Sequence, residues 1–119
     1  MIVTGALLAE SASVVDNKLN IQGGVVDTCR AGSERVVQAT LVVLIQPEPF
    51  DQSPKVVIRF TDPSGNSQDQ TLDVPESSLG GEIGFVCYPL ALPVPVDGRH
   101  SLAVESRGGS VNLPLKVIS

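Results

Sequence analysis

The sequence predicts a single all-β domain, built as a sandwich or barrel of short strands. Apolar and polar residues alternate with a period of two along most of the chain, and no window has a convincing helical repeat. Clusters of Gly, Pro and Asp separate the alternating runs about every 8 to 12 residues, as in sandwiches and barrels. The length of 119 residues fits one domain, residues 1–119.

The composition indicates which side chains build the core. Hydrophobic residues make up 42% of the chain and aromatic residues only 3%. The core is therefore expected to consist mainly of Val, Leu and Ile, which suit pleated, half-buried surfaces. Nine candidate strands are expected, at residues 2–10, 18–22, 24–29, 35–46, 55–60, 69–74, 82–92, 99–106 and 110–119.

The first candidate strand is apolar on both faces. One face is expected to carry Ile2, Ala6 and Leu8, and the other Val3, Leu7 and Ala9. Such a strand is either central in a sheet and covered on both sides, or part of a contact with another chain.

Two adjacent glycines, Gly23 and Gly24, separate the second and third candidate strands. A phosphate-binding loop would need a helix to begin after them, because the amides at a helix N-terminus form the anion site. The residues that follow, VVDTC, favour a strand instead. We expect a bulge or kink that lets one long strand bend from one part of the sheet to another.

The middle strand, residues 35–46, has the clearest alternation. Its core face is expected to carry Val37, Ala39, Leu41, Val43 and Ile45, and its other face Gln38, Thr40 and Gln46. Val36, Val42 and Leu44 fall on the second face, which makes that face a further candidate for contact with another chain.

The next two strands have one core face each, and they surround a turn. One face is expected to carry Val56, Ile58 and Phe60 in the first strand and Gln70, Leu72 and Val74 in the second, and the other face of each strand is expected to be wet. Residues 62–65 (Asp-Pro-Ser-Gly) carry Pro and Gly where a reverse turn needs them. Residues 75–81 can form at most one short helical turn.

The last three strands follow the same pattern. Val111, Leu113, Leu115 and Val117 share one face, and Pro114 suits an edge strand or a bulge because it lacks an N–H donor. Turns are expected at residues 96–99 and 107–110. Phe60 and Phe85 are expected to point inward. Tyr88 has the opposite phase to Phe85, so it is either exposed or packed on a second layer.

Three stretches, together with the long middle strand, resemble a bacterial family of small single-domain proteins of unknown function. They are ALLAESASVVDNKLNIQGGVVD, VVIRFTDPSGN and VPVDGRHSLAVESRGGSVNLPLKV. The resemblance covers nearly the whole chain and implies an immunoglobulin-like antiparallel β-sandwich of seven to nine strands. This chain has Arg99 and His100 after Asp97-Gly98, where the family has an aromatic residue soon after the glycine. The family brings no catalytic residues to carry over.

Cys29 and Cys87 are the only cysteines. Their separation suits the disulfide between the sheets of an immunoglobulin domain, but the tryptophan that packs on such a bridge is absent. We expect two small buried thiols that stay reduced in a chain without an export signal. A metal site would need more ligands, and only one histidine is present.

The single histidine limits hydrolytic chemistry. Any Ser-His-Asp arrangement must use His100, with Asp97 and Ser101 nearby in sequence, and no G-x-S-x-G motif occurs. His100 shares the phase of Leu102 and Val104, so we expect a histidine at the end of a core-facing row. The sequence therefore predicts a non-enzymatic protein with no catalytic, cofactor-binding or metal-binding residues.

Acidic residues suggest one alternative. Asp69 and Asp73 share a face with Thr71, and Asp62 lies at a neighbouring turn. A calcium site at one end of the sandwich would require Asp62 and Asp69 to meet Asp97 or Asp27. Otherwise Asp16, Asp27, Asp51 and Asp97 are turn residues.

Charge and hydropathy exclude several classes of partner. The net charge is −5 and the eight basic residues are scattered, which disfavours nucleic-acid binding. No apolar run approaches the roughly 18 residues of a membrane span, and the N-terminal run lacks the basic segment of a signal peptide. The sequence predicts a cytoplasmic protein that does not act at membranes.

Two functions are consistent with these observations. The first is an interaction or structural module that uses a sheet face or an open edge and binds a protein partner, which can be a second copy of the chain. Such a module can also belong to a larger assembly, viral particles included. The alternative is a domain that binds calcium or a small ligand through its acidic loops.

Overall fold

Extended strands account for most of the chain in the computed structural model, which describes residues 1–50, 52–107 and 109–119. Nine strands and one short 3-10 turn form within these ranges. In chain order they are β1 (Ile2–Val15), β2 (Lys18–Gly24), β3 (Thr28–Arg30), β4 (Val36–Gln46), β5 (Lys55–Thr61), β6 (Ser67–Asp73), η1 (Glu76–Leu79), β7 (Gly84–Pro93), β8 (Gly98–Ser106) and β9 (Gly109–Ile118). Each expected segment overlaps one of these strands; the first is longer than expected and the third is shorter.

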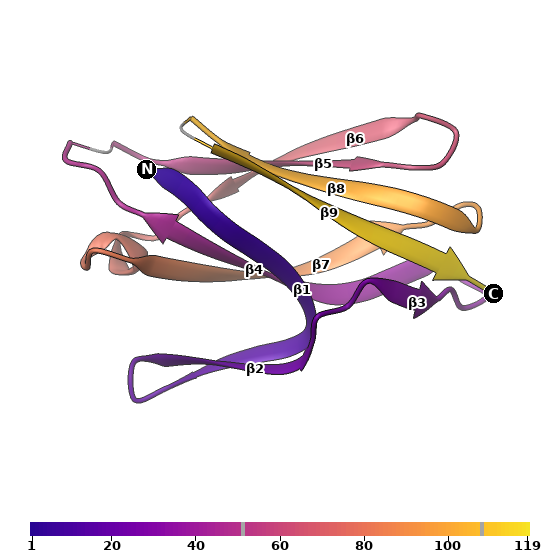
Figure 1. Ribbon diagram of the computed structural model, residues 1–119, viewed down its shortest axis with the longest axis horizontal. Helices are drawn as coiled ribbons and strands as arrows, with labels where there is room; N and C mark the ends of the chain where they lie inside the picture. The colour runs from indigo at the N-terminus through magenta and orange to yellow at the C-terminus, as the bar shows by residue number, and fades with distance from the viewer. Residues whose placement is uncertain (51, 108) are drawn as a thin grey trace.

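The strands form two layers packed face to face (Figure 1). Sheet A has the order β2-β1-β4-β7, and sheet B has the order β3-β9-β8-β5-β6. Neighbouring strands are antiparallel, except that β3 runs parallel to β9 over three residue pairs. The predicted all-β, immunoglobulin-like sandwich is confirmed, and the single parallel pair departs from the all-antiparallel expectation. The described residues contain no α-helix, and η1 is the one short turn predicted for residues 75–81.

The core lies between the two sheets and consists almost entirely of aliphatic side chains. Sheet A contributes alternate residues of β4 to it, and sheet B contributes alternate residues of β5 and β8. The fully buried large side chains include Leu41, Ile45, Val56, Leu102 and Leu115. The predicted core faces of residues 35–46 and 55–60 are confirmed.

A β-bulge in β1 changes which residues point inward. The pairing of β1 with β4 shifts between Val3 and Gly5. Val3 therefore packs in the core together with Ala6 and Leu8, whereas strict alternation placed it on the opposite face. The prediction for Val3 was wrong because one extra residue in a strand reverses the alternation beyond it.

Gly23 and Gly24 stand where the chain leaves sheet A for sheet B. β2 ends at Gly24, and the next strand, β3, belongs to the other sheet. The crossing is tied to both layers, because the N–H of Val26 donates to Leu8 O and the N–H of Lys116 donates to Asp27 O. The expected kink is confirmed, because Gly23 has φ of 65° and its pair with Glu10 is missing from the register. The expected continuation of one long strand was wrong, because β2 ends at Gly24. No helix begins after them, so they do not form a phosphate loop.

The predicted turns lie between strands. Asp62 Oδ1 accepts hydrogen bonds from the N–H groups of Ser64 and Asn66 and so closes the β5–β6 turn. Gly98, with φ of 125°, begins β8 after the chain crosses from sheet A to sheet B. β8 and β9 form a hairpin through the pair Ser106 and Gly109. Two predicted turn residues, Gly108 and Asp51, lie outside the described residues.

Pro114 lies on the open part of an edge. The N–H of Lys116 points toward the β3 side of β9, and Pro114 has the same phase along the strand. β3 pairs with β9 only at residues 116–118, so no β3 residue stands opposite the missing N–H. The predicted edge position of Pro114 is confirmed.

Candidate functional site

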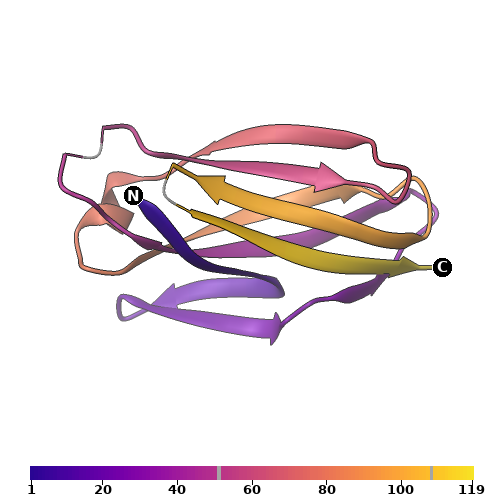
Figure 2. The ribbon, with the colours of Figure 1, turned by 45° about the horizontal axis from the view of Figure 1, so that its top comes forward.

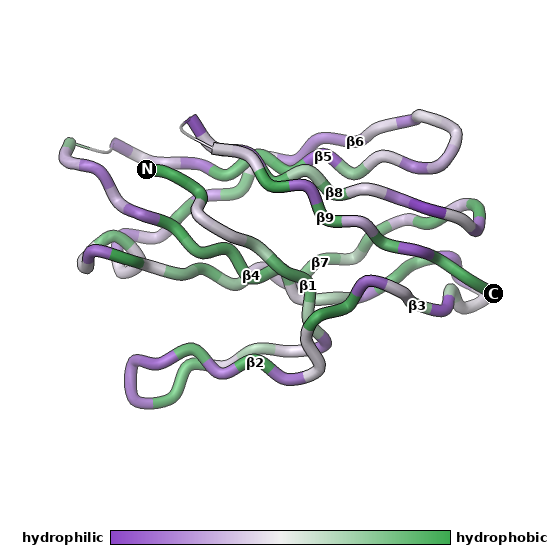
Figure 3. Tube along the Cα trace, viewed as in Figure 1, coloured by the Kyte–Doolittle hydropathy of each residue, from purple (hydrophilic) through white to green (hydrophobic). Residues whose placement is uncertain are grey.

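The outer faces of the two sheets differ in charge. The outer face of sheet B carries ion pairs, with Arg59 Nε 2.9 Å from Asp69 Oδ1 and Lys55 paired with Asp73. Arg59 donates a hydrogen bond that lowers the pKa of Asp69. Among the described residues of the four strands of sheet A, by contrast, only Glu10 and Lys18 are charged. Figure 3 shows long hydrophobic stretches along β1, β4 and β7.

An apolar patch occupies the middle of the outer face of sheet A. Two cross-strand rows build it, because Leu7 pairs with Val42 and Val42 with Cys87, while Leu44 pairs with Gly5 and Phe85. We define the apolar patch as Leu7, Val42, Leu44, Phe85 and Cys87. Val42 is buried by its neighbours, and Leu44 keeps 38% of its surface exposed.

Phe85 points to the opposite side from the one expected, and Tyr88 takes the packed one of its two expected positions. Phe85 shares the outward row with Leu44, whereas Val86, on the next phase of β7, is in the core. Tyr88 packs against the core, and its hydroxyl donates a 2.8 Å hydrogen bond to Asp73 O on β6. The inward prediction for Phe85 was wrong, and the packed alternative for Tyr88 is confirmed.

The ends of β1 and β2 form a hairpin that projects from the sandwich. We call residues 10–24 the arm. Nearly all of its residues are exposed, and Asp16 and Asn17, both with positive φ, form its tip. In Figure 1 β1 bends sharply and the arm runs back beneath β4 and β7, and Figure 2 shows it projecting from the body of the sandwich.

The bend lies at Glu10 and Gly23, the pair that is missing from the register of β1 and β2. Gly23 has φ of 65°, which L-residues rarely adopt. A Cβ atom at Gly23 would also lie 2.4 Å from Glu10 Oε2. A larger residue at position 23 would therefore require the Glu10 side chain to move and would hold a backbone conformation that favours glycine.

A groove of about 720 Å³ separates the arm from sheet A. Val14 and Asn17 line it from the arm, and Ile83, Phe85 and Cys87 line it from β7 and the preceding loop. The sequence analysis missed both the arm and this groove. The Asp-Asn pair between two alternating runs is a hairpin signal that predicts the arm, but no sequence signal predicts the bend direction.

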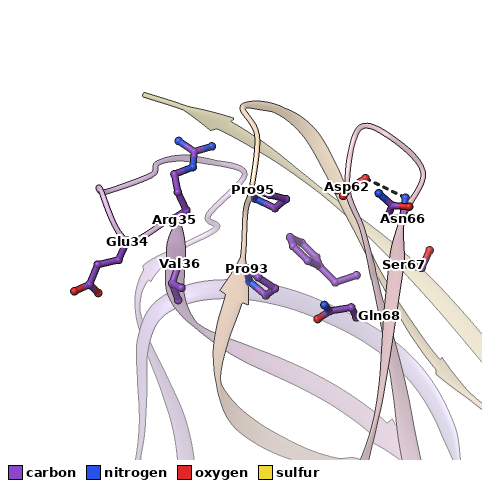
Figure 4. Close-up of a pocket in the computed structure, with 10 residues that line it drawn as sticks. Glu34, Arg35, Val36, Asp62, Asn66, Ser67, Gln68, Pro93 and Pro95 are labelled. Carbon is purple, nitrogen blue, oxygen red and sulfur yellow. Dashed lines mark hydrogen bonds between the residues drawn. The ribbon is translucent and has the colours of Figure 1, made fainter.

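A second cavity, of about 470 Å³, opens between the end of β7 and the β5–β6 turn (Figure 4). Rings of Phe60, Pro93 and Pro95 line it together with polar side chains such as Gln68. Its only basic residue, Arg35, donates to Val94 O at 2.8 Å and to Asp97 Oδ1 at 2.9 Å. The residues lining this cavity include no histidine or cysteine, and they combine apolar rings with charged and amide side chains such as Glu34 and Asn66.

The structure does not bring the candidate calcium ligands together. Asp62 closes its own turn, and Asp69 and Asp73 each pair with a basic residue on β5. Asp97 accepts hydrogen bonds from Ser119 and Arg35, which lower its pKa. Within the described ranges no group of three His, Cys, Asp or Glu side chains could hold a metal ion.

The candidate triad is not assembled. His100 is fully buried at the start of the row that continues with Leu102 and Val104, as predicted, and its ring stacks on Phe60 with centroids 5.2 Å apart. Its Nδ1 lies 3.2 Å from Gly98 O, and among the described residues no partner reaches Nε2. Asp97 is engaged with Arg35 and Ser119, so these side chains do not form a proton relay.

Cys29 and Cys87 are free and lie on different sheets. Cys29, on β3, packs against the core, while Cys87 is on the outer face of sheet A. Both are half-buried, and burial raises the pKa of each thiol. The predicted reduced thiols are therefore confirmed as free, although neither is fully buried.

No protein-family model matches this chain, and no curated protein matches it either. Over the described residues, no helix is long and apolar enough to cross a membrane.

Tyr88 generates a prediction for alkaline stability. Burial and the charge of Asp73 raise the pKa of Tyr88 to about 12 from a usual value of 10.0. Unfolding therefore releases the phenol proton at a pH between these values, and the stability that Tyr88 contributes is full below pH 10 and is lost as the pH rises toward 12. Tyr88→Phe should remove this part of the pH dependence.

The measurement is direct, because Tyr88 is the only tyrosine and the chain has no tryptophan. Phenolate absorbance should titrate near 12 in the folded protein and near 10 in urea. Equal midpoints in the two states would show that Tyr88 is solvated and would contradict the packing described above.

His100 generates a prediction for stability. An unpartnered buried polar atom costs about 1–3 kcal/mol, and His100→Leu removes it together with one hydrogen bond and one ring contact. We expect urea denaturation to show a change below about 1.5 kcal/mol, compared with about 2–5 kcal/mol for Leu102→Ala in the same core. A loss for His100→Leu as large as that of the control would contradict this account.

Proposed function

We propose that this domain is a non-enzymatic interaction module that associates with a second copy of itself through the outer face of sheet A. The observation that carries the proposal is the contrast between two outward faces, one with ion pairs and the other with an uncharged apolar patch. A sheet face that is exposed to water normally carries polar residues, which alternate along each strand with the apolar residues of the core. Leu44 and Phe85 break that pattern on sheet A.

The total exposed surface supports an association of standard size. The chain exposes 7137 Å², compared with about 6,100 Å² for a folded monomer of 12.4 kDa. The excess of about 1,000 Å² is similar to the roughly 800 Å² that each partner buries in a standard interface. The Cα radius of gyration, 14.5 Å, also exceeds the value of about 13.5 Å expected for this length.

If the partner is a second copy, charge favours this face over the rest of the surface for the contact. Two chains that each carry a net charge of −5 repel each other over most of their surfaces. The outer face of sheet A lacks acidic residues apart from Glu10 at the base of the arm. Two copies can therefore approach through this face without bringing like charges together.

The strand edges β6 and β7 are less suited to pairing with another chain. β6 carries Asp69 and Asp73, and charged side chains on an edge oppose strand addition. β7 contains Pro89 and Pro93, which lack N–H donors. These features favour the sheet face over these edges as the contact surface.

We place the module in a bacterial cytoplasm and in the family it resembles by sequence. Free Cys29 and Cys87 are compatible with a reducing compartment. The calcium-binding alternative receives no comparable support, because the acidic side chains that it requires are engaged separately.

A single substitution tests the proposed face. Size-exclusion chromatography with light scattering should give about twice 12.4 kDa for the unchanged protein at micromolar concentration. Leu44→Glu places a charge within the contact, so the dissociation constant should rise about a hundredfold. Because Leu44 is partly exposed in the single copy, its folding stability should change by less than about 1 kcal/mol.

The matched control is Ala103→Glu, at an outward position in the middle of sheet B beside Arg59. This variant should assemble like the unchanged protein. A protein that is monomeric at all accessible concentrations, or equal assembly of the two variants, would refute self-association through sheet A.

A further inference from the structure

We propose that the arm is the element exchanged in this association: the arm of each copy packs its apolar side on the apolar patch of the other copy. This inference rests on the proposed self-association and names the segment that produces it. The result is a two-fold symmetric contact in which the arm of each chain covers the apolar patch of the other chain.

The two sides of the arm differ in polarity. Directly opposed residues place Ala12 beside Ile21 and Val14 beside Leu19 on one side. The other side carries three pairs, which are Ser11 with Gln22, Ser13 with Asn20, and Val15 with Lys18. A two-stranded hairpin is marginally stable alone in water, so the apolar side of the arm needs a surface to cover it.

The arm covers the sheet of its own chain only in part, because Val42 is buried whereas Leu44 keeps 38% of its surface exposed. Val14 lines the groove from one side and keeps 57% of its surface exposed, and Ile83 lines it from the other side and keeps 74% exposed. The groove of about 720 Å³ between them leaves two apolar surfaces facing each other with solvent between. The exposed parts of both surfaces, at Val14, Leu44 and Ile83, are therefore available to a second copy.

One chain carries both halves of the required contact. A reciprocal exchange buries two arms and two apolar patches with a single kind of interface, as two-fold symmetry requires. The charged residues of the arm lie at its base (Glu10), at its tip (Asp16) and directly after the tip (Lys18), so no charge stands among the apolar pairs. Nearly all residues of the arm are exposed, and the excess surface of the whole chain has the size that one partner of a dimer buries.

Adjacent valines on opposite sides of the arm provide a matched test. Val14 and Val15 are 57% and 55% exposed, so neither substitution by Asp should disturb folding, which circular dichroism would verify. Val14→Asp should raise the dissociation constant of the dimer at least about tenfold. Val15→Asp, beside Lys18 on the polar side, should leave it unchanged.

The outcome separates this inference from the proposed function. If Leu44→Glu disrupts the dimer while Val14→Asp and Val15→Asp behave alike, sheet A is the interface and the arm exchange is wrong. If the unchanged protein is monomeric, the proposed function fails as well.

A disulfide test locates the arm directly. In a Cys29→Ser background, Val14→Cys leaves a thiol on the apolar side of the arm and Cys87 on the patch, and both positions line the groove. Oxidation by dissolved oxygen with a copper catalyst should give a covalent dimer on a non-reducing gel. The control, Ser13→Cys in the same background, lies on the polar side and should remain monomeric.

Three results would overturn the exchange. They are a disulfide formed within one chain, no disulfide at all, and equal dimer formation by the Ser13→Cys control. If no disulfide forms because a cysteine variant folds poorly, the comparison of Val14→Asp with Val15→Asp still tests the same contact, since it does not depend on oxidation.

Discussion

The burial of β4 between its neighbours determines which side chains of sheet A meet the outside. Val37, Leu41, Val43 and Ile45 point into the shared core, and the period of two then forces Leu44 to point outward. A slip of one residue would expose all the core residues at once, so the register is strongly specified. The fixed register of β4 therefore makes these apolar residues point outward. A partner that covers them would explain why this face is apolar.

The arm depends on two local features that act together. The chain bends where Gly23 accommodates the Glu10 side chain, and it crosses to sheet B immediately afterwards through Val26 and Asp27. The two backbone hydrogen bonds of the crossing fix the base of the arm on the sandwich, while few contacts hold its tip. A segment of this kind can change its packing partner without disturbing the core.

Charged and titratable side chains that could act in catalysis are engaged in structural contacts, as expected for a binding protein. Arg59, Arg35 and Lys55 each pair with an acid, and His100 is enclosed by the core. These groups stabilise turns and strand pairs. The outer face of sheet A, by contrast, presents apolar side chains such as Leu44 and Phe85, which is the character expected of a protein contact.

The sequence by itself determined the fold class, the nine strands, the core faces of β4 and β5, and the inward position of His100, because alternation and turn residues are local signals. Tertiary structure alone decided the side of Val3 and the crossing at Gly24. A bulge reverses a phase without changing composition, and a glycine pair permits both a bend and a crossing. The apolar side of the arm is readable in the sequence, but its position opposite Phe85 and Cys87 depends on the bend at Glu10, a contact between residues on two strands.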